Sequence, residues 1–142
     1  MANNNKGQSS LTVLRVVLGI IFIAHGYVKL FVPNGFSGFV GLLTAIKIPL
    51  PLYAGILVSI LEFAGGILLF IGLFSRWTSV FLIIEMLVTL FRVHLKNGFF
   101  ISQQSYGYEF NLLILGVLLA ILFGGPGALS LGKNYFKSKH LH

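Results

Sequence analysis

The sequence contains no cysteine, so the chain cannot form a disulfide framework, a thiolate metal site or thiol redox chemistry of its own. Acidic residues are also scarce: three glutamates and no aspartate stand against ten lysine and arginine residues in 142 positions. Charged residues make up only 9% of the chain, whereas hydrophobic residues make up 56%. This composition excludes a soluble globular domain and predicts an integral membrane protein in contact with the lipid bilayer.

A cleavable signal sequence and a nucleic-acid-binding face are also missing. The first hydrophobic run has no short core ending in an A-x-A-like site, so we expect it to remain as a membrane anchor. The ten residues before it, MANNNKGQSS, are expected to be disordered. Lysine and arginine lie mostly at the ends of hydrophobic runs, where membrane topology and anionic headgroups explain them. We therefore predict no nucleic-acid partner.

Four hydrophobic runs predict an all-α protein, a four-helix transmembrane bundle. The run 51–74 is long enough to cross a hydrocarbon core of about 30 Å at about 1.5 Å per residue. The predicted spans are about 11–31, 51–74, 77–95 and 108–123, in one domain, 11–132, followed by a basic tail, 133–142. The segment 36–48 is too short to cross, and its apolar residues at helical spacing predict a short interfacial helix between the first two spans.

The distribution of basic residues predicts the orientation of the bundle. Four spans place both termini on the same side of the membrane, together with the turn between the second and third spans. More basic residues lie on that side than in the opposite loops, so the positive-inside rule predicts a multi-pass cell-membrane protein with both termini cytoplasmic. The residues on the cytoplasmic side are Lys6, Arg76, Lys133, Lys137 and Lys139, and those opposite are Lys29, Lys47 and Lys96.

Glu62 is the single charged residue of the second predicted span and lies at its midpoint. An ionised carboxylate at this depth costs at least about 2.5 kcal/mol, so Glu62 is expected to face protein or a cavity and to have a partner. Other ionisable residues lie within or near the spans. We expect a central pair, Glu62 and Glu85, and an outer mixed cluster. The full set is Arg15, His25, Lys29, Glu62, Glu85, Arg92, His94 and Glu109.

These ionisable residues predict a polar cleft that opens toward the outer leaflet. In the functional interpretation, Glu62 and His25 relay protons as the catalytic pair, and the ligand-binding residues are Arg15, Lys29, His94 and Glu109. In the structural alternative, Arg15 pairs with Glu62 or Glu85, and Lys29 pairs with Glu109, to fix helix register. Glu85 shares a helix face with Arg92, and the two are predicted to form a structural ion pair.

The histidines do not have the spacing of a metal or haem site. His25 and His94 lie on different spans without a second ligand one helical turn away, so no metal site is predicted. His94 lies about 180° from Glu85 on a regular helix, so only one of them can face the core unless the helix unwinds near its end. The sequence does not identify a cofactor, and we favour a quinone, whose flat head would suit phenylalanines lining a cleft, over haem or a metal.

Short motifs recur along the chain in a fixed order. The first span contains R-x-x-x-G and H-G-Y-x-K-L, and the second contains E-x-x-G-G-x-x-L-x-x-G. His94 precedes G-F-F, and Y-G-Y-E precedes G-x-G-x-L-S-L. Over about residues 11–132 this arrangement resembles the DoxX family of small four-span membrane proteins. In two departures from the family pattern, Ser130-Leu131-Gly132 lacks the acid of the usual S-x-D, and Glu85 and Arg92 lie outside the motifs.

The resemblance implies a link to thiosulfate:quinone oxidation, oxidative-stress complexes, or quinone and catechol detoxification. We therefore expect a membrane component of a quinone-linked redox or oxidative-stress system that binds a quinone or small phenolic ligand. Two alternatives stay open: a non-enzymatic scaffold that recruits a soluble oxidoreductase, and a small proton-coupled transporter. The lack of inverted repeats counts against a transporter. Glycine-rich helix faces also leave a homodimer open.

Overall fold

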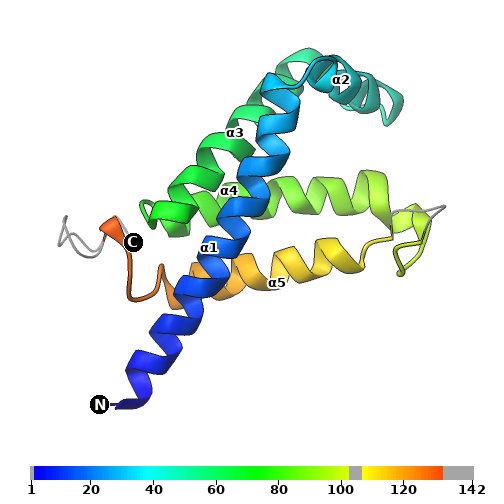
Figure 1. The fold of residues 1–142 in the computed structure, drawn as a ribbon. Helices are drawn as coiled ribbons and strands as arrows, with labels where there is room; N and C mark the ends of the chain where they lie inside the picture. The colour runs from blue at the N-terminus through cyan, green and yellow to red at the C-terminus, as the bar shows by residue number, and fades with distance from the viewer. Residues whose placement is uncertain (1, 103–106, 133–142) are drawn as a thin grey trace.

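The computed structural model describes residues 2–102 and 107–132, and the predicted basic tail, 133–142, lies outside the described residues. The described part is helical and contains no strand, which confirms the all-α prediction (Figure 1). The helices are α1 (Ala2–Phe31), α2 (Gly35–Ala45), α3 (Pro51–Ile71), α4 (Ser75–Thr89) and α5 (Glu109–Gly124). Between α4 and α5 lie a π-helical turn, η1 (Leu90–His94), and a 3-10 turn, η2 (Leu95–Asn97).

Three helical segments are long and apolar enough to cross a membrane. These are Lys6–Phe31, Pro51–Ile71 and Ser75–Asn97. Helix α5 is apolar but has only 16 residues, which correspond to about 24 Å at about 1.5 Å per residue. The segments support a multi-pass membrane protein, and the fourth crossing stays a prediction.

Helix α1 begins at Ala2 and so includes most of the polar segment 1–10. Its first turns are held by the segment that follows α5. The backbone N–H of Ala128 donates to the carbonyl of Gln8 at 3.2 Å and to the hydroxyl of Thr12 at 2.9 Å. The first turns of α1 therefore gain partners from a distant part of the chain, which local composition does not reveal.

The helices form two pairs that cross each other. Helices α1 and α3 run side by side, α4 and α5 form a second pair, and α2 folds over the end where α1 meets α3 (Figure 1). Glycines allow α1 and α3 to touch through their backbones. A Cβ atom at Gly26 would lie 2.4 Å from the backbone nitrogen of Phe63, and one at Gly19 would lie 2.8 Å from that of Phe70. Only glycine fits at these positions, as in other closely packed membrane helices.

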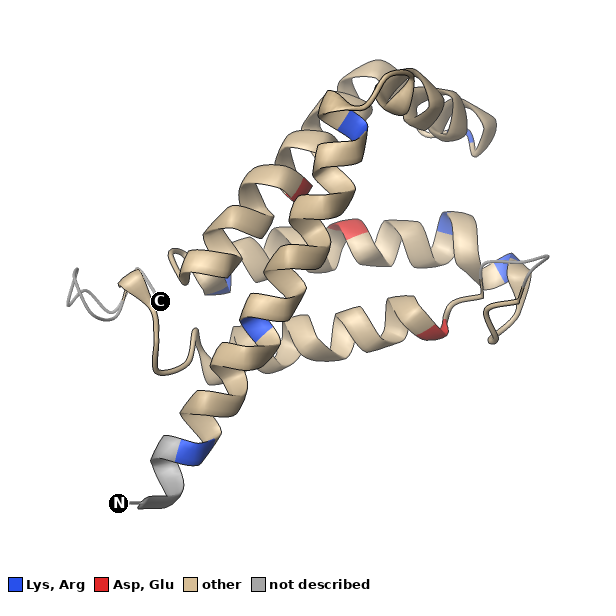
Figure 2. Ribbon diagram, viewed as in Figure 1, with Lys and Arg blue, Asp and Glu red and all other residues tan. Residues whose placement is uncertain are grey.

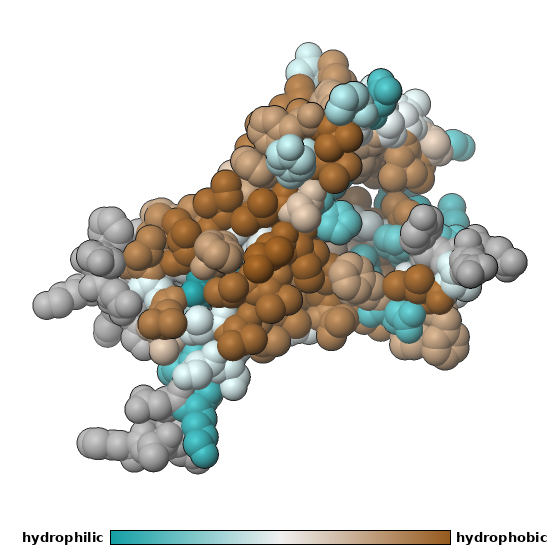
Figure 3. All heavy atoms as spheres, viewed as in Figure 1, coloured by the Kyte–Doolittle hydropathy of each residue, from teal (hydrophilic) through white to brown (hydrophobic). Residues whose placement is uncertain are grey.

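The hydrophobic core lies where the two pairs cross. Its buried residues come from α1, α3, α4, η1 and α5: Leu18, Phe22, Leu69, Leu82, Met86, Leu90, Ile114, Leu115, Leu118 and Ile121. Many other large apolar side chains are exposed, and hydrophobic residues cover much of the face shown in Figure 3. This outer surface suits contact with lipid tails, and the shared core fixes how the two pairs are placed around the site.

Candidate functional site

A cavity of about 700 Å³ lies between the helix pairs, beside the core. All five helices, η1 and the segment before α5 contribute to its walls, which are mostly aliphatic and aromatic. This volume is in the range of small-molecule sites, which combine apolar walls with a few polar groups. The ionisable residues that line the cavity are His25, Lys29, Glu62, Glu85 and His94.

Lys29 and Glu62 form a partly buried ion pair at this cavity. The ammonium of Lys29, in the last turn of α1, donates to Oε2 of Glu62 on α3. The same ammonium lies 4.4 Å from the centre of the Phe39 ring, a distance suited to a cation–π contact. Glu62 is only 4% exposed. It therefore has both the cavity position and the partner that its depth requires, but this partner is Lys29 and not Arg15.

Glu85 joins this ion pair from the opposite side. Its side chain is 9% exposed and interacts with both Glu62 and Lys29. Its Oε2 atom is buried and has no hydrogen-bond partner among the described residues. The predicted ion pair with Arg92 is not found in the described part of the chain, where Arg92 is exposed. The three acids thus lie on α3, on α4 and at the start of α5, with two of them at the cavity (Figure 2).

The π-helical turn η1 places His94 at the same cavity as Glu85. On a regular α-helix the two residues would point in opposite directions. A π-helical turn adds a residue to the turn and rotates the residues beyond it, so both side chains line the cavity. The helix therefore changes from α-helical to π-helical geometry near its end. Such a departure from a regular helix was required for both Glu85 and His94 to face inward.

Arg15 lies away from the cavity, in a sealed junction between three parts of the chain. Its guanidinium is 1% exposed and donates only to backbone carbonyls. Two of these end α3, and two lie in the segment after α5. The acceptors are Leu69, Phe70 at 2.6 Å, Pro126 at 2.8 Å and Leu129. Arg15 therefore pairs with neither Glu62 nor Glu85, because carbonyls left open at the end of α3 occupy its donors.

Gly72 and Ser130 complete this Arg15 junction. Gly72 follows α3 with a φ of +75°, and a Cβ atom there would lie 2.9 Å from the guanidinium carbon of Arg15. The hydroxyl of Ser130 donates to the carbonyl of Gly72 at 2.9 Å, and the N–H of Gly132 donates to the same carbonyl at 3.2 Å. Gly132 stands where the S-x-D pattern has its acid, and it still contacts the junction through its backbone N–H.

Glu109 also lies outside the cavity lining. Its Oε1 accepts a hydrogen bond from the backbone N–H of Ile101 at 2.8 Å, at the start of α5, where the helix dipole favours an acid. The expected pair of Lys29 with Glu109 is replaced by the pair with Glu62. Of the six residues expected around the cleft, the cavity brings together His25, Lys29, Glu62 and His94.

Asn111 is a polar cavity residue that sequence reasoning missed. It is 5% exposed, lines the cavity and donates from its side-chain amide to the carbonyl of Met86 at 3.0 Å. The sequence signal that could have identified Asn111 is its polar amide within an otherwise apolar run. In the described part of the chain no group of three or more histidine or acidic residues could hold a metal ion.

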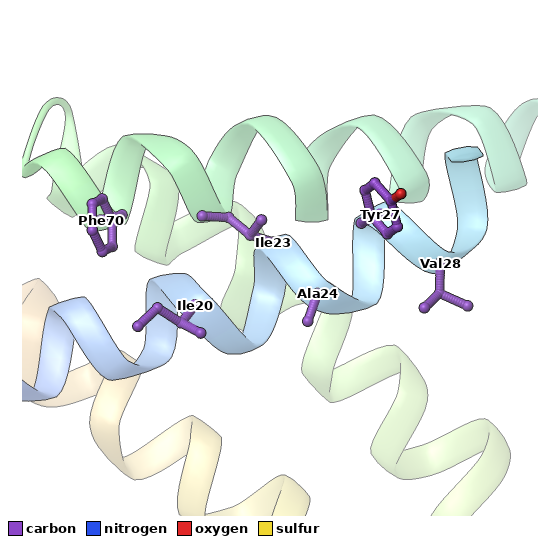
Figure 4. A pocket seen from close by; sticks show the side chains of 6 residues that line it. All are labelled: Ile20, Ile23, Ala24, Tyr27, Val28 and Phe70. Carbon is purple, nitrogen blue, oxygen red and sulfur yellow. The ribbon is translucent and has the colours of Figure 1, made fainter. Parts of the chain in front are cut away.

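A second, shallower hollow lies on the outer face of α1 and α3. Six side chains line its volume of about 370 Å³, all of them on α1 except Phe70, and Figure 4 shows them along the two helices. They are Ile20, Ile23, Ala24, Tyr27, Val28 and Phe70. Because none of them carries a charge at neutral pH, this hollow suits lipid contact better than chemistry.

Comparison with known proteins gives a consistent set of relatives. The DoxX family matches residues 10–95. An uncharacterized protein of Haemophilus influenzae is 35% identical over 129 residues, which cover 89% of this chain and 91% of that protein. "Inner membrane protein YphA" of Escherichia coli is 29% identical over 127 residues, covering 87% and 89%. "Putative oxidoreductase CatD" of Bacillus subtilis is 29% identical over 136 residues, covering 96% and 94%. No solved structure matches this chain.

Proposed function

This chain belongs to the DoxX family of membrane proteins, and we propose that it is a membrane component of a quinone-linked redox or oxidative-stress system. In this proposal a quinone or small phenolic ligand binds in the cavity between the helix pairs. The observation that carries the proposal is one polar cluster, Lys29, Glu62 and Glu85, in the wall of a mostly apolar cavity. The name of the Bacillus subtilis relative supports redox chemistry.

The chemistry of a quinone matches the groups at this cavity. Its ring suits apolar walls and the edge of Phe39, and its oxygens can accept hydrogen bonds from an ammonium or a protonated imidazole. Reduction to a quinol takes up two electrons and two protons. His25 and Glu62 would relay the protons, and the electrons would come from a soluble oxidoreductase, a partner that the sequence left open. The chain itself thus binds and protonates the ligand.

We also propose that α5 crosses the membrane and that both termini are cytoplasmic. The N-terminal end of α1 and the segment after α5 meet at the Arg15 junction, which also holds the end of α3. The excess of basic residues on this side supports a cytoplasmic position. Reporter enzymes fused to either terminus should be active in the cytoplasm only. Activity of either fusion outside the membrane would contradict the orientation.

The experiment that tests ligand binding uses purified protein in lipid nanodiscs. Extraction should recover membrane quinone, and equilibrium dialysis should measure binding of a short-chain benzoquinone. Lys29→Met and Glu62→Gln should each weaken binding about tenfold, because each removes a charge-assisted hydrogen bond. Lys47→Met is the matched control, since Lys47 is exposed and does not line the cavity. Absence of quinone both from the extract and from dialysis would overturn the proposal.

A further inference from the structure

Glu85 lines the cavity but has no part in the proton relay proposed above. Its side chain is more than nine-tenths buried, lines the cavity and leaves Oε2 without a hydrogen-bond partner among the described residues. A buried carboxyl oxygen without a partner is costly, and native proteins tend to keep such groups where function needs them. Oε2 therefore offers the strongest unused contact for a ligand.

The charges around Glu85 do not balance if both carboxyl groups are ionised. The ammonium of Lys29 is in contact with Glu62, and Glu85 interacts electrostatically with both of these residues. The other titratable groups facing the cavity are His25 on α1 and His94 on η1, and the linings from α2 and α5 contain none. Two carboxylates beside one ammonium in an apolar wall would leave a net negative charge. One proton shared between the two carboxyl groups removes that excess.

We propose that Glu85 holds a proton shared with Glu62 and contacts the ligand through Oε2, so that the cavity selects uncharged hydroxyl- or carbonyl-bearing rings over carboxylates. This inference rests on the proposed function and names the ligand class of the same site. Oε2 can accept from a phenolic hydroxyl or, when it carries the proton, donate to a quinone carbonyl. A ligand carboxylate would add a third acid beside the Lys29 ammonium, which already serves Glu62.

The first test compares two ring compounds of similar size with the nanodisc-embedded protein. One is tert-butylhydroquinone, which is neutral, and the other is 4-tert-butylbenzoate, which is anionic. The native protein should bind the neutral compound at least about tenfold more tightly at neutral pH. Equal affinity for the two compounds would overturn the claimed selectivity.

The second test uses variants of Glu85 and follows pH. Glu85→Leu should weaken hydroquinone binding about tenfold, because the contact is lost. Glu85→Gln keeps the size and hydrogen bonding of a protonated carboxyl group, so it should bind with native affinity at neutral pH. At a pH high enough to remove the shared proton, native affinity should change, whereas that of Glu85→Gln should stay constant. A purely structural role would not produce this difference.

Arg92→Gln is the matched control, because it removes a charge from the next turns of the same helical segment at an exposed position. It should leave binding unchanged. If Arg92→Gln instead weakened hydroquinone binding as much as Glu85→Leu does, the interaction of Glu85 with Glu62 would be overturned in favour of a pair with Arg92. If Glu85→Leu binds hydroquinone as tightly as the native protein does, the inference about Glu85 is overturned, whereas the proposed function still stands.

Infrared spectroscopy tests the shared proton without a ligand. The native protein at neutral pH should show the carbonyl band of a protonated carboxyl group, which Glu85→Gln removes and Arg92→Gln retains. Absence of this band in the native protein would overturn the shared proton even if the ligand binds. If the native protein shows the band but binds neither ring compound, the proposed function fails, and with it the contact between Glu85 and a ligand.

Discussion

Two cations on α1, one at the Arg15 junction and one at the cavity, are satisfied in different ways. Arg15 is sealed, and its donors go to four backbone carbonyls. Lys29, about 21 Å further along the helix, pairs with Glu62 at the cavity wall, beside Glu85, which keeps an oxygen without a partner among the described residues. Buried charge alone therefore does not mark a binding site. The distinguishing feature is whether the partners of that charge exhaust its hydrogen-bonding capacity.

The difference has a structural consequence for the two helix pairs. The Arg15 junction joins the start of α1, the end of α3 and the segment after α5. At the other end of α1, the two helix pairs are separated by the cavity, which α2 and the segment before α5 also line. We infer that the Arg15 junction stabilises the fold, whereas the polar groups at the cavity lower the stability of the fold because ligand binding requires them. Four predictions test this division.

Arg15→Met should have the largest effect on stability. Four backbone carbonyls would lose a charged donor, two of them in buried hydrogen bonds. Each buried group left unsatisfied costs about 1 to 3 kcal/mol, so the free energy of unfolding should fall by about 3 kcal/mol. Arg15→Lys should restore little of it, because an ammonium has fewer donors and no planar fork. Denaturation in mixed detergent micelles, followed by circular dichroism, measures both. A loss no larger than that of Arg92→Met, at an exposed position, would contradict the junction.

Gly26→Ala should have the second effect, because the contact between α1 and α3 has no room for a methyl group at this position. Overpacking typically costs about 1 to 3 kcal/mol, and the better helix propensity of alanine recovers at most about 1. Thermal unfolding followed by Trp77 fluorescence should show a lower midpoint. Gly41→Ala is the control, since nothing lies within 4 Å of its added Cβ. An unchanged or higher midpoint for Gly26→Ala would argue against the close contact.

Lys29→Met should destabilise the fold by less, about 1 to 2 kcal/mol, because Glu62 can take up a proton when its partner is removed. The double variant Lys29→Met/Glu62→Gln should lose less stability than the sum of the single variants. The same detergent denaturation measures this coupling. Additivity within about 0.5 kcal/mol would mean that the two side chains do not interact.

Glu109→Ala should have the smallest and most local effect. Loss of one exposed hydrogen bond to the N–H of Ile101, and of an acid at the start of α5, costs about 0.5 to 1.5 kcal/mol. Hydrogen exchange should speed up in the peptide that contains Ile101, while hydroquinone affinity should change less than about twofold. A large loss of affinity would place Glu109 in the binding site after all.

The helices were predictable from sequence because their limits depend on local signals. Pro51 occupies the first position of α3, as expected for a helix start. Helix α3 ends at Ile71 and not at residue 74, because Gly72 takes a left-handed conformation against the guanidinium of Arg15. The position of Glu62 at a cavity also followed from its depth in an apolar run. These features need only short windows of sequence and the cost of an unpaired charge.

The partners of the ionisable residues were less predictable. Arg15 binds carbonyls, which every residue possesses, so no side-chain pattern identifies its acceptors. The choice of Lys29 for Glu62 depends on the tertiary crossing of α1 and α3. The π-helical turn that brings His94 to the cavity and leaves Arg92 exposed has no evident local signal. Each of these outcomes depends on long-range packing.

The Arg15 junction also has a consequence for biosynthesis. Ribosomes make the chain from its amino terminus, so Arg15 enters the bilayer long before Pro126 and Leu129 exist. Until then its guanidinium lacks two of its four acceptors, in surroundings where an uncompensated charge is costly. A nascent or truncated polypeptide therefore cannot close the junction. Arg15 therefore reaches its full set of acceptors only after the segment that follows α5 has been made.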